Sequence, residues 1–141
     1  MIRVVDASVA LKWFVEEDGS RQAAALLTGG DSLIAPDLIV PEVCNACWKL
    51  VRRQLMRPAQ QQLAIARLPM ILDELVPTSL LAHRSVAIAN QLDHPAYDCF
   101  YLVLAEQRSG TLITADRRLI DRVSGTAWQE SVIDLRTITE N

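Results

Sequence analysis

The chain has 141 residues, half of them apolar, which is enough for one domain with a sizeable core. Five Gly, six Pro and the lack of low-complexity segments argue against disorder, and three Cys do not make the disulfide framework of a secreted protein. No apolar run reaches the ~18 residues that span a membrane, and the N-terminus lacks the apolar segment of a signal peptide, so we expect a cytoplasmic protein without a membrane partner.

Strand and helix patterns alternate along the whole chain. In chain order we expect a strand at 2–5, helices at 8–17 and 20–27, a strand at 32–35, helices at 37–54 and 58–72, a strand at 74–76, helices at 78–91 and 95–109, a strand at 111–114, a helix at 117–123 and a strand at 131–135. This alternation predicts parallel βαβ units with helices on both faces of the sheet, in one domain over residues 1–141.

Three of the expected helices carry features that bear on function. Ser8 is a plausible N-cap of the first one. Pro41 predicts a kink or restart in the helix at 37–54, which would place Glu42 in a first turn, and Pro69 is expected to bend or end the next helix. In the helix at 95–109 the inward face is expected to include Tyr97, Tyr101, Leu102, Leu104 and Ala105.

Four acidic residues lie where the pattern changes from apolar to polar. Asp6 and Asp116 each follow a strand, and Glu42 and Asp98 lie near the starts of two apolar helices. In an α/β fold these positions converge on one edge of the sheet. Four carboxylates meeting there would bind a hard divalent cation. The pattern therefore favours metal-dependent phosphodiester chemistry.

Each acid also has an ordinary structural interpretation. Asp6 fits a turn or an N-cap, Asp116 fits a cap of the helix at 117–123, and Glu42 suits a helix N-terminus. Asp98 is harder to explain in this way, because an acid in an apolar helix is either at an exposed edge or buried with a partner.

Other polar residues allow two interpretations each. Ser8 and Thr114 lie two residues from Asp6 and Asp116, and on extended backbone they would share a face with those acids. Asn45 follows Glu42 by one helical turn. We interpret these three as candidates to support the carboxylates, with an ordinary cap or core polar group as the alternative for each.

Two further motifs have less specific patterns. Cys44 and Cys47 form a CxxC motif. Because this motif lies inside an expected helix, we interpret the two cysteines as packing residues and not as metal ligands. His94, four residues before Asp98, fits either the rim of the site or an ordinary loop.

The net charge of −3 does not by itself indicate a nucleic-acid partner. Basic residues do form two groups, each of which also fits an ordinary solvated helix face. They are Lys49, Arg52, Arg53 and Arg57, and Arg117, Arg118 and Arg122.

Four segments that contain the four acids follow one another along the chain. They are Val4-Val5-Asp6-Ala7-Ser8, then Pro41-Glu42-Val43 with Asn45-Ala46 and Trp48, then Tyr97 to Ala105 around Asp98, and Leu112 to Leu119 with Thr114 and Asp116. In this order they resemble the PIN-domain ribonucleases, most closely the VapC-type toxins of bacterial toxin–antitoxin pairs. The resemblance covers nearly the whole chain and implies a PIN-like three-layer α/β/α domain with a central, mostly parallel sheet.

The resemblance also implies a mechanism. Asp6, Asp98 and Asp116 would be the main ligands of Mg²⁺ or Mn²⁺, and Glu42 would either ligate the ion or orient the attacking water. The products would carry a 5′-phosphate and a 3′-hydroxyl. Leu119 stands where many members of the family carry a further acid, so the resemblance leaves open whether the site binds one ion or two.

The resemblance implies an endoribonuclease toxin that cleaves RNA, is inhibited by a cognate antitoxin and forms a homodimer. Two alternatives stay open: the same nuclease used in RNA maturation without an antitoxin, and a non-catalytic PIN-like binding module. The presence of all four acids argues against the binding module.

Overall fold

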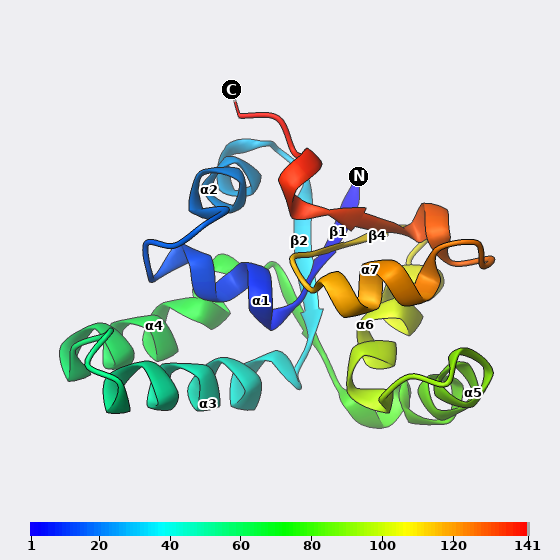
Figure 1. Cartoon of the computed structure of the whole chain (residues 1–141), viewed down its shortest axis with the longest axis horizontal. Coiled ribbons are helices and arrows are strands. Elements are labelled where there is room, and N and C mark those ends of the chain that lie inside the picture. Colours follow the sequence, from blue (N-terminus) through cyan, green and yellow to red (C-terminus); the bar gives the residue numbers. More distant parts are fainter. Residues whose placement is uncertain (141) are drawn as a thin grey trace.

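The computed structural model describes residues 1–140 and is built around a five-stranded sheet (Figure 1). The strands are β1 (Ile2–Val5), β2 (Ser32–Pro36), β3 (Glu74–Val76), β4 (Thr111–Thr114) and β5 (Val132–Asp134). Their order is β3-β2-β1-β4-β5, and all four pairings are parallel. The prediction of a mostly parallel sheet is confirmed.

Helices cover both faces of this sheet. They are α1 (Ala7–Ala10), α2 (Ser20–Thr28), α3 (Ile39–Arg52), α4 (Pro58–Ile71), α5 (Ala82–Leu92), α6 (Ala96–Gln107) and α7 (Arg117–Val123). Short 3₁₀ turns are η1 (Leu11–Trp13), η2 (Thr78–Leu80), η3 (Gln129–Ser131) and η4 (Leu135–Thr137). Figure 1 shows α1 to α4 on one side of the sheet and α5 to α7 on the other. The three-layer α/β/α prediction is therefore confirmed.

The central strands carry apolar residues on both faces because helices cover both. Val4 and Val5 of β1 and Leu112 and Ile113 of β4 are fully buried. Helix α6 packs against β1, β2 and β4, and most of its residues from Cys99 to Ala105 are buried. This packing explains why α6 is apolar nearly all round. An acid in its first turn, Asp98, is therefore unusual in this helix.

The order of the strands places a switch point at the centre of the sheet. The chain starts in β1, moves outward to β2 and β3, and returns to β4 on the other side of β1. The segments that leave β1 and β4 then go to opposite faces, because α1 and α7 lie in different layers (Figure 1). In such sheets the crevice beyond the carboxyl ends of these two strands is the usual binding place.

The helix after β1 differs from the prediction in length and in its cap. The α-helix spans only Ala7–Ala10 and continues as η1 to Trp13, whereas a helix to residue 17 was expected. Its N-cap is Asp6, whose carboxylate accepts a hydrogen bond from the backbone N–H of Val9, so the prediction of Ser8 as the cap was wrong. The cap is set by backbone geometry, because Asp6 is still extended while Ser8 is already helical.

Both prolines of the α3–α4 pair are tolerated without a break. Helix α3 begins at Ile39, so Pro41 lies in the first turn, where its missing N–H leaves no bond unmade, and Glu42 is a first-turn acid as expected. Pro69 lies in the last turn of α4, which ends two residues later at Ile71. No described helix has the length and apolar character needed to cross a membrane.

Candidate active site

The four acids come together at the carboxyl edge of the sheet. Asp6 follows β1, Asp116 follows β4, Glu42 lies in the first turn of α3, and Asp98 lies in the first turn of α6. They line one small cavity, together with Ala7, Ser8 and Tyr101. The expected convergence of acids from four separate segments is therefore present.

Asp6 is the most deeply buried and most firmly held of the four. Its side chain accepts hydrogen bonds from the Ser8 hydroxyl at 2.5 Å, from the Val9 N–H at 3.2 Å and from the Thr114 hydroxyl. Burial disfavours the charged form and raises the Asp6 pKa from 3.8 to about 6, although these hydrogen bonds act in the opposite direction. A buried carboxylate of this kind gains from a nearby cation.

Ser8 and Thr114 tie the ends of β1 and β4 together through Asp6. The Ser8 hydroxyl also accepts from the Ala115 N–H at 3.1 Å, and the Thr114 hydroxyl accepts from the Asp116 N–H at 3.0 Å. Thr114 is fully buried. The two predicted supporting hydroxyls therefore contact Asp6 directly and also position the backbone that carries Asp116.

Glu42 is held by a residue on another helix. The Tyr101 hydroxyl donates to Glu42 Oε1 at 2.5 Å, joining α6 to α3. Burial raises the Glu42 pKa; the Tyr101 hydrogen bond lowers it, and the charge of Asp98 raises it further. Tyr101 itself is buried, and that burial, with Glu42 nearby, raises its pKa far above the usual range, so it stays protonated and remains a donor.

Asp98 is paired with a buried histidine. His94 Nε2 lies 2.6 Å from Asp98 Oδ2, four residues away, and the His94 side chain is only 5% exposed. His94 lies just before α6, whose N-cap is Pro95, and Asp98 lies in the first turn of that helix, so the chain brings the two side chains together where it enters α6. The sequence allowed His94 to lie at the rim of the site or in an ordinary loop, and the structure places it at the site.

Asp116 serves as the N-cap of α7. Its Oδ1 accepts from the backbone N–H of Arg118 at 3.0 Å, and its side chain also lines the acid cavity. The ordinary interpretation of Asp116 as a cap is therefore correct. It does not compete with a role as a ligand, because a carboxylate has a second oxygen.

Other candidates lie outside the cavity. The Asn45 side chain is exposed on α3, and Asn45 is absent from the cavity lining, so its supporting role stays a prediction. Cys47 is fully buried in the core, which agrees with a packing role for that motif. Leu119 is buried as well, so it is a core residue of α7.

Sequence reasoning missed the polar roles of two residues. Tyr101 was expected only to pack inward, yet it also donates to Glu42. His94 was placed no more closely than the rim or a loop. For His94, the available signal in the sequence was its separation of four residues from Asp98. For Tyr101, no local signal exists, because Glu42 is 59 positions away in the sequence.

The donor set suits a hard cation. Carboxylate and hydroxyl oxygens dominate the cavity, and a Cys thiol is absent from its lining. Among residues 1–140, no three His, Cys, Asp or Glu side chains already form a group that would hold an ion. Each acid instead accepts hydrogen bonds from its own neighbours. Mg²⁺ tolerates such a site, because it keeps several waters and commonly takes one or two carboxylates plus substrate phosphate oxygens.

Known proteins with similar sequences and the same fold support these observations. The family model of the PIN domain matches residues 3–125. Ribonuclease VapC3 of Pyrobaculum aerophilum is 34% identical over 121 residues, which cover 84% of this chain and 92% of that protein. Ribonuclease VapC9 of Mycobacterium tuberculosis is 31% identical over 118 residues, which cover 84% and 88%.

Solved structures share the fold at lower identity. PAE2754 from Pyrobaculum aerophilum superimposes with a TM-score of 0.73 at 21% identity, covering 97% of this chain and 85% of that one. VapBC2 from Rickettsia felis, bound to a DNA fragment from its promoter, gives a TM-score of 0.64 at 13% identity, covering 95% and 98%. The chain therefore belongs to the PIN-domain family and, within it, to the VapC ribonucleases.

Proposed function

We propose that this protein is a metal-dependent endoribonuclease that acts as the toxin of a toxin–antitoxin pair. The observation that carries the proposal is the meeting of Asp6, Glu42, Asp98 and Asp116 in one cavity at the switch point of the sheet. Relatives with at least 31% identity that bear the name ribonuclease VapC support RNA as the substrate.

Mg²⁺ or Mn²⁺ is the proposed cofactor, as one or two ions. Asp6, Asp98 and Asp116 would hold it, and Glu42 would ligate it or act beside it. When bound, such an ion offsets the charge of the phosphodiester and lowers the pKa of a water. The oxygen-rich lining and the buried carboxylate of Asp6 favour this assignment.

The chain's own residues divide the remaining work. Ser8 and Thr114 fix the orientation of Asp6, and His94 fixes that of Asp98. Glu42, with its pKa raised by burial, is the best-placed group to orient the attacking water and accept its proton. Attack at phosphorus with loss of the 3′-oxygen gives a 5′-phosphate and a 3′-hydroxyl.

An antitoxin would silence the enzyme by covering the site and a groove beside α3. Trp48 is 50% exposed, with Arg52 stacked 5.2 Å from its ring centre, in a groove that Lys49 and Arg53 also line. Apolar residues of an antitoxin tail would pack on Trp48, and an Arg of the tail would enter the acid cavity. A guanidinium suits that role because it is always charged and binds carboxylates with two bonds.

The proposal extends to the assembly. Residues 1–141 would act as a single nuclease domain, since one sheet runs from Ile2 to Asp134. A homodimer is part of the proposal, and the exposed Leu80, Val86 and Tyr97 on neighbouring elements are apolar side chains that a dimer could cover. The proposed substrate, cellular RNA, places the action in the cytoplasm.

The function is tested first with purified protein and RNA. Wild-type protein should cleave RNA with Mg²⁺ or Mn²⁺ and stop in EDTA. Asp6→Asn and Asp98→Asn should remove nearly all activity while circular dichroism shows an intact fold. Asp18→Asn is the matched control, because Asp18 is exposed and does not line the acid cavity. Full activity in EDTA would refute the metal requirement.

The toxin role is tested in cells. Expression of the wild-type chain alone should halt growth, and the Asp98→Asn form should not. Co-expression with the neighbouring gene should give a stable complex and restore growth. A harmless wild-type enzyme that still cleaves RNA, with no neighbour that binds it, would favour RNA maturation instead.

A further inference from the structure

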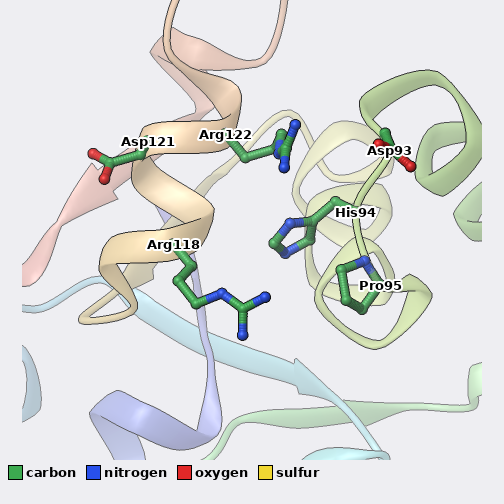
Figure 2. A pocket seen from close by; sticks show the side chains of 6 residues that line it. All are labelled: Asp93, His94, Pro95, Arg118, Asp121 and Arg122. Atoms are coloured by element: carbon green, nitrogen blue, oxygen red, sulfur yellow. The ribbon is translucent and has the colours of Figure 1, made fainter.

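A second cleft opens beside the acid cavity, between α7 and the segment that joins α5 to α6. Figure 2 shows this cleft, with side chains from both walls. It is lined by Asp93, His94, Pro95, Arg118, Asp121 and Arg122. None of these residues has a part in the proposed chemistry except His94, so the cleft needs its own explanation.

The cleft and the acid cavity share a wall. His94 lines the cleft, and its Nε2 lies 2.6 Å from Oδ2 of Asp98, which lines the acid cavity. The same relation holds on the opposite wall, where Arg118 lines the cleft and its backbone N–H bonds the Asp116 carboxylate. A strand whose phosphate lies at the acids would therefore continue into this cleft.

The charged groups that line the cleft are two arginines, Arg118 and Arg122, and two carboxylates, Asp93 and Asp121. Arg118 and Arg122 are four residues apart on α7, so their side chains share one face of the helix. In Figure 2 both arginine side chains reach from α7 toward His94; the Asp121 carboxylate extends the other way from the helix, although Asp121 also contributes to the lining of the cleft. Within residues 1–140 no carboxylate forms an ion pair with either arginine, and Asp121 lies 4.0 Å from Arg117 instead.

We propose that this cleft binds a backbone phosphate of the RNA strand next to the phosphate that is cleaved, with Arg118 and Arg122 as its ligands. The inference rests on the proposed ribonuclease function and adds a substrate-binding site to it. Each planar guanidinium can donate two N–H bonds to two oxygens of one phosphate, and the two arginines lie next to the acid cavity, where an adjacent nucleotide would be placed. Contacts to phosphate position a strand without reading its sequence.

RNA is favoured over a protein segment as the occupant for two reasons. The cleft has few apolar side chains, Pro95 being the main one, so a protein tail would find little to pack against. It also continues directly from the cavity of the acids, whereas the exposed Trp48 groove on α3 offers apolar packing for a protein. Binding of the neighbouring gene's protein in the cleft is the competing outcome of the test.

The test separates binding from cleavage by using an inactive background. In Asp6→Asn protein, binding of a fluorescein-labelled single-stranded RNA of mixed sequence is measured by anisotropy over a series of salt concentrations. Arg118→Ala and Arg122→Ala should each weaken binding on the order of tenfold, and each should lower the slope of log K against log salt by about 0.7. The alanine variant of Arg118 keeps the backbone N–H that bonds Asp116.

Arg117→Ala is the matched control. It removes the same charge from the same helix, but Arg117 lines a different cavity, with Lys12 and Arg136. Its effect on affinity and slope should be small. In the active protein, Arg118→Ala and Arg122→Ala should lower kcat/KM mainly by raising KM, because a flanking phosphate is bound equally before and during the reaction.

Several results would overturn the proposal. Equal losses in all three variants would mean a general effect of charge. Unchanged RNA binding with lost binding of the neighbouring gene's protein would assign the cleft to that protein. In both cases wild-type cleavage stands, so the ribonuclease function survives; if the wild-type chain neither binds nor cleaves RNA, both proposals fall together.

Discussion

The Tyr101 hydroxyl lies 2.5 Å from Glu42 Oε1, and this bond joins two helices on opposite faces of the sheet. It is a contact from the buried side of α6 to the first turn of α3. Tyr101 thus positions the one acid that is proposed to orient the attacking water.

Replacement of Tyr101 by Phe should impair catalysis more than folding. The ring stays, so the core remains filled, and loss of the hydrogen bond costs about 1 kcal/mol of unfolding free energy. Glu42 loses its orienting donor, and kcat should fall while KM changes little. Steady-state kinetics and urea unfolding measure the two effects. If Tyr101→Phe lowers kcat further in Glu42→Gln protein, Tyr101 acts by some other route than Glu42.

Thr114→Val should remove the support that the end of β4 gives to Asp6 and Asp116. The Thr114 hydroxyl donates to Asp6 and accepts from the Asp116 N–H, so valine removes a donor from the buried Asp6 carboxylate and leaves the part-buried Asp116 N–H without this partner. We expect a loss of about 1–3 kcal/mol in unfolding free energy and weaker Mn²⁺ binding. Urea unfolding and isothermal calorimetry provide the measurements. Thr139→Val, at an exposed position, is the control.

The metal-free protein should lose stability as the pH rises from about 4 to about 6. Because burial raises the Asp6 pKa from 3.8 to about 6, the folded chain keeps a proton that the unfolded chain has released. The free energy of unfolding then falls across this window, by roughly 3 kcal/mol at most. Urea unfolding in EDTA at a series of pH values measures it. Asp6→Asn should flatten the curve, and an unchanged curve would contradict the raised pKa.

Addition of Mg²⁺ or Mn²⁺ should raise the melting temperature, because only the folded chain brings the acids together. At a metal concentration 100 times the Kd the stabilisation is about 2.7 kcal/mol. Differential scanning calorimetry measures this without any nuclease assay. The shift should vanish in Asp6→Asn and persist in Asp18→Asn. A shift that persists in Asp6→Asn would place the ion elsewhere.

Trp48→Ala should weaken the antitoxin complex without slowing RNA cleavage. Trp48 is half exposed on α3 and is outside the lining of the acid cavity. Loss of a central aromatic anchor commonly costs about 2 kcal/mol or more of binding free energy. Calorimetry with the purified antitoxin measures the effect. Leu27→Ala on α2 is the control, since Leu27 is an exposed apolar residue elsewhere.

The sequence was sufficient to predict the order of strands and helices and the convergence of the acids. Those features depend on local signals, namely apolar runs that end in an acid, and on the topology that βαβ units impose. Asp6 and Asp116 could be placed together because both follow parallel strands. The two-residue shift in the cap of α1, from Ser8 to Asp6, arises because periodicity does not fix where the backbone leaves the strand.

Contacts between distant helices could not be predicted. Tyr97 was expected to pack inward, yet it is 65% exposed, while Tyr101 on the same helix is buried and reaches Glu42. An apolar helix gives no clear periodicity from which to choose its buried face, and the neighbouring helices decide it. The cleft of Arg118 and Arg122 likewise exists only because the turn at Asp93–Pro95 faces α7.

The bond between Thr114 and Asp6 joins residues 108 positions apart and has a consequence for synthesis on the ribosome. A nascent chain that stops before Thr111 lacks β4, and with it Thr114, Asp116 and the support for Asp6. Truncated chains should therefore be unable to cut RNA, including the messenger being translated. We therefore expect RNA-cleaving activity to arise only after β4 has been synthesised, close to the end of translation.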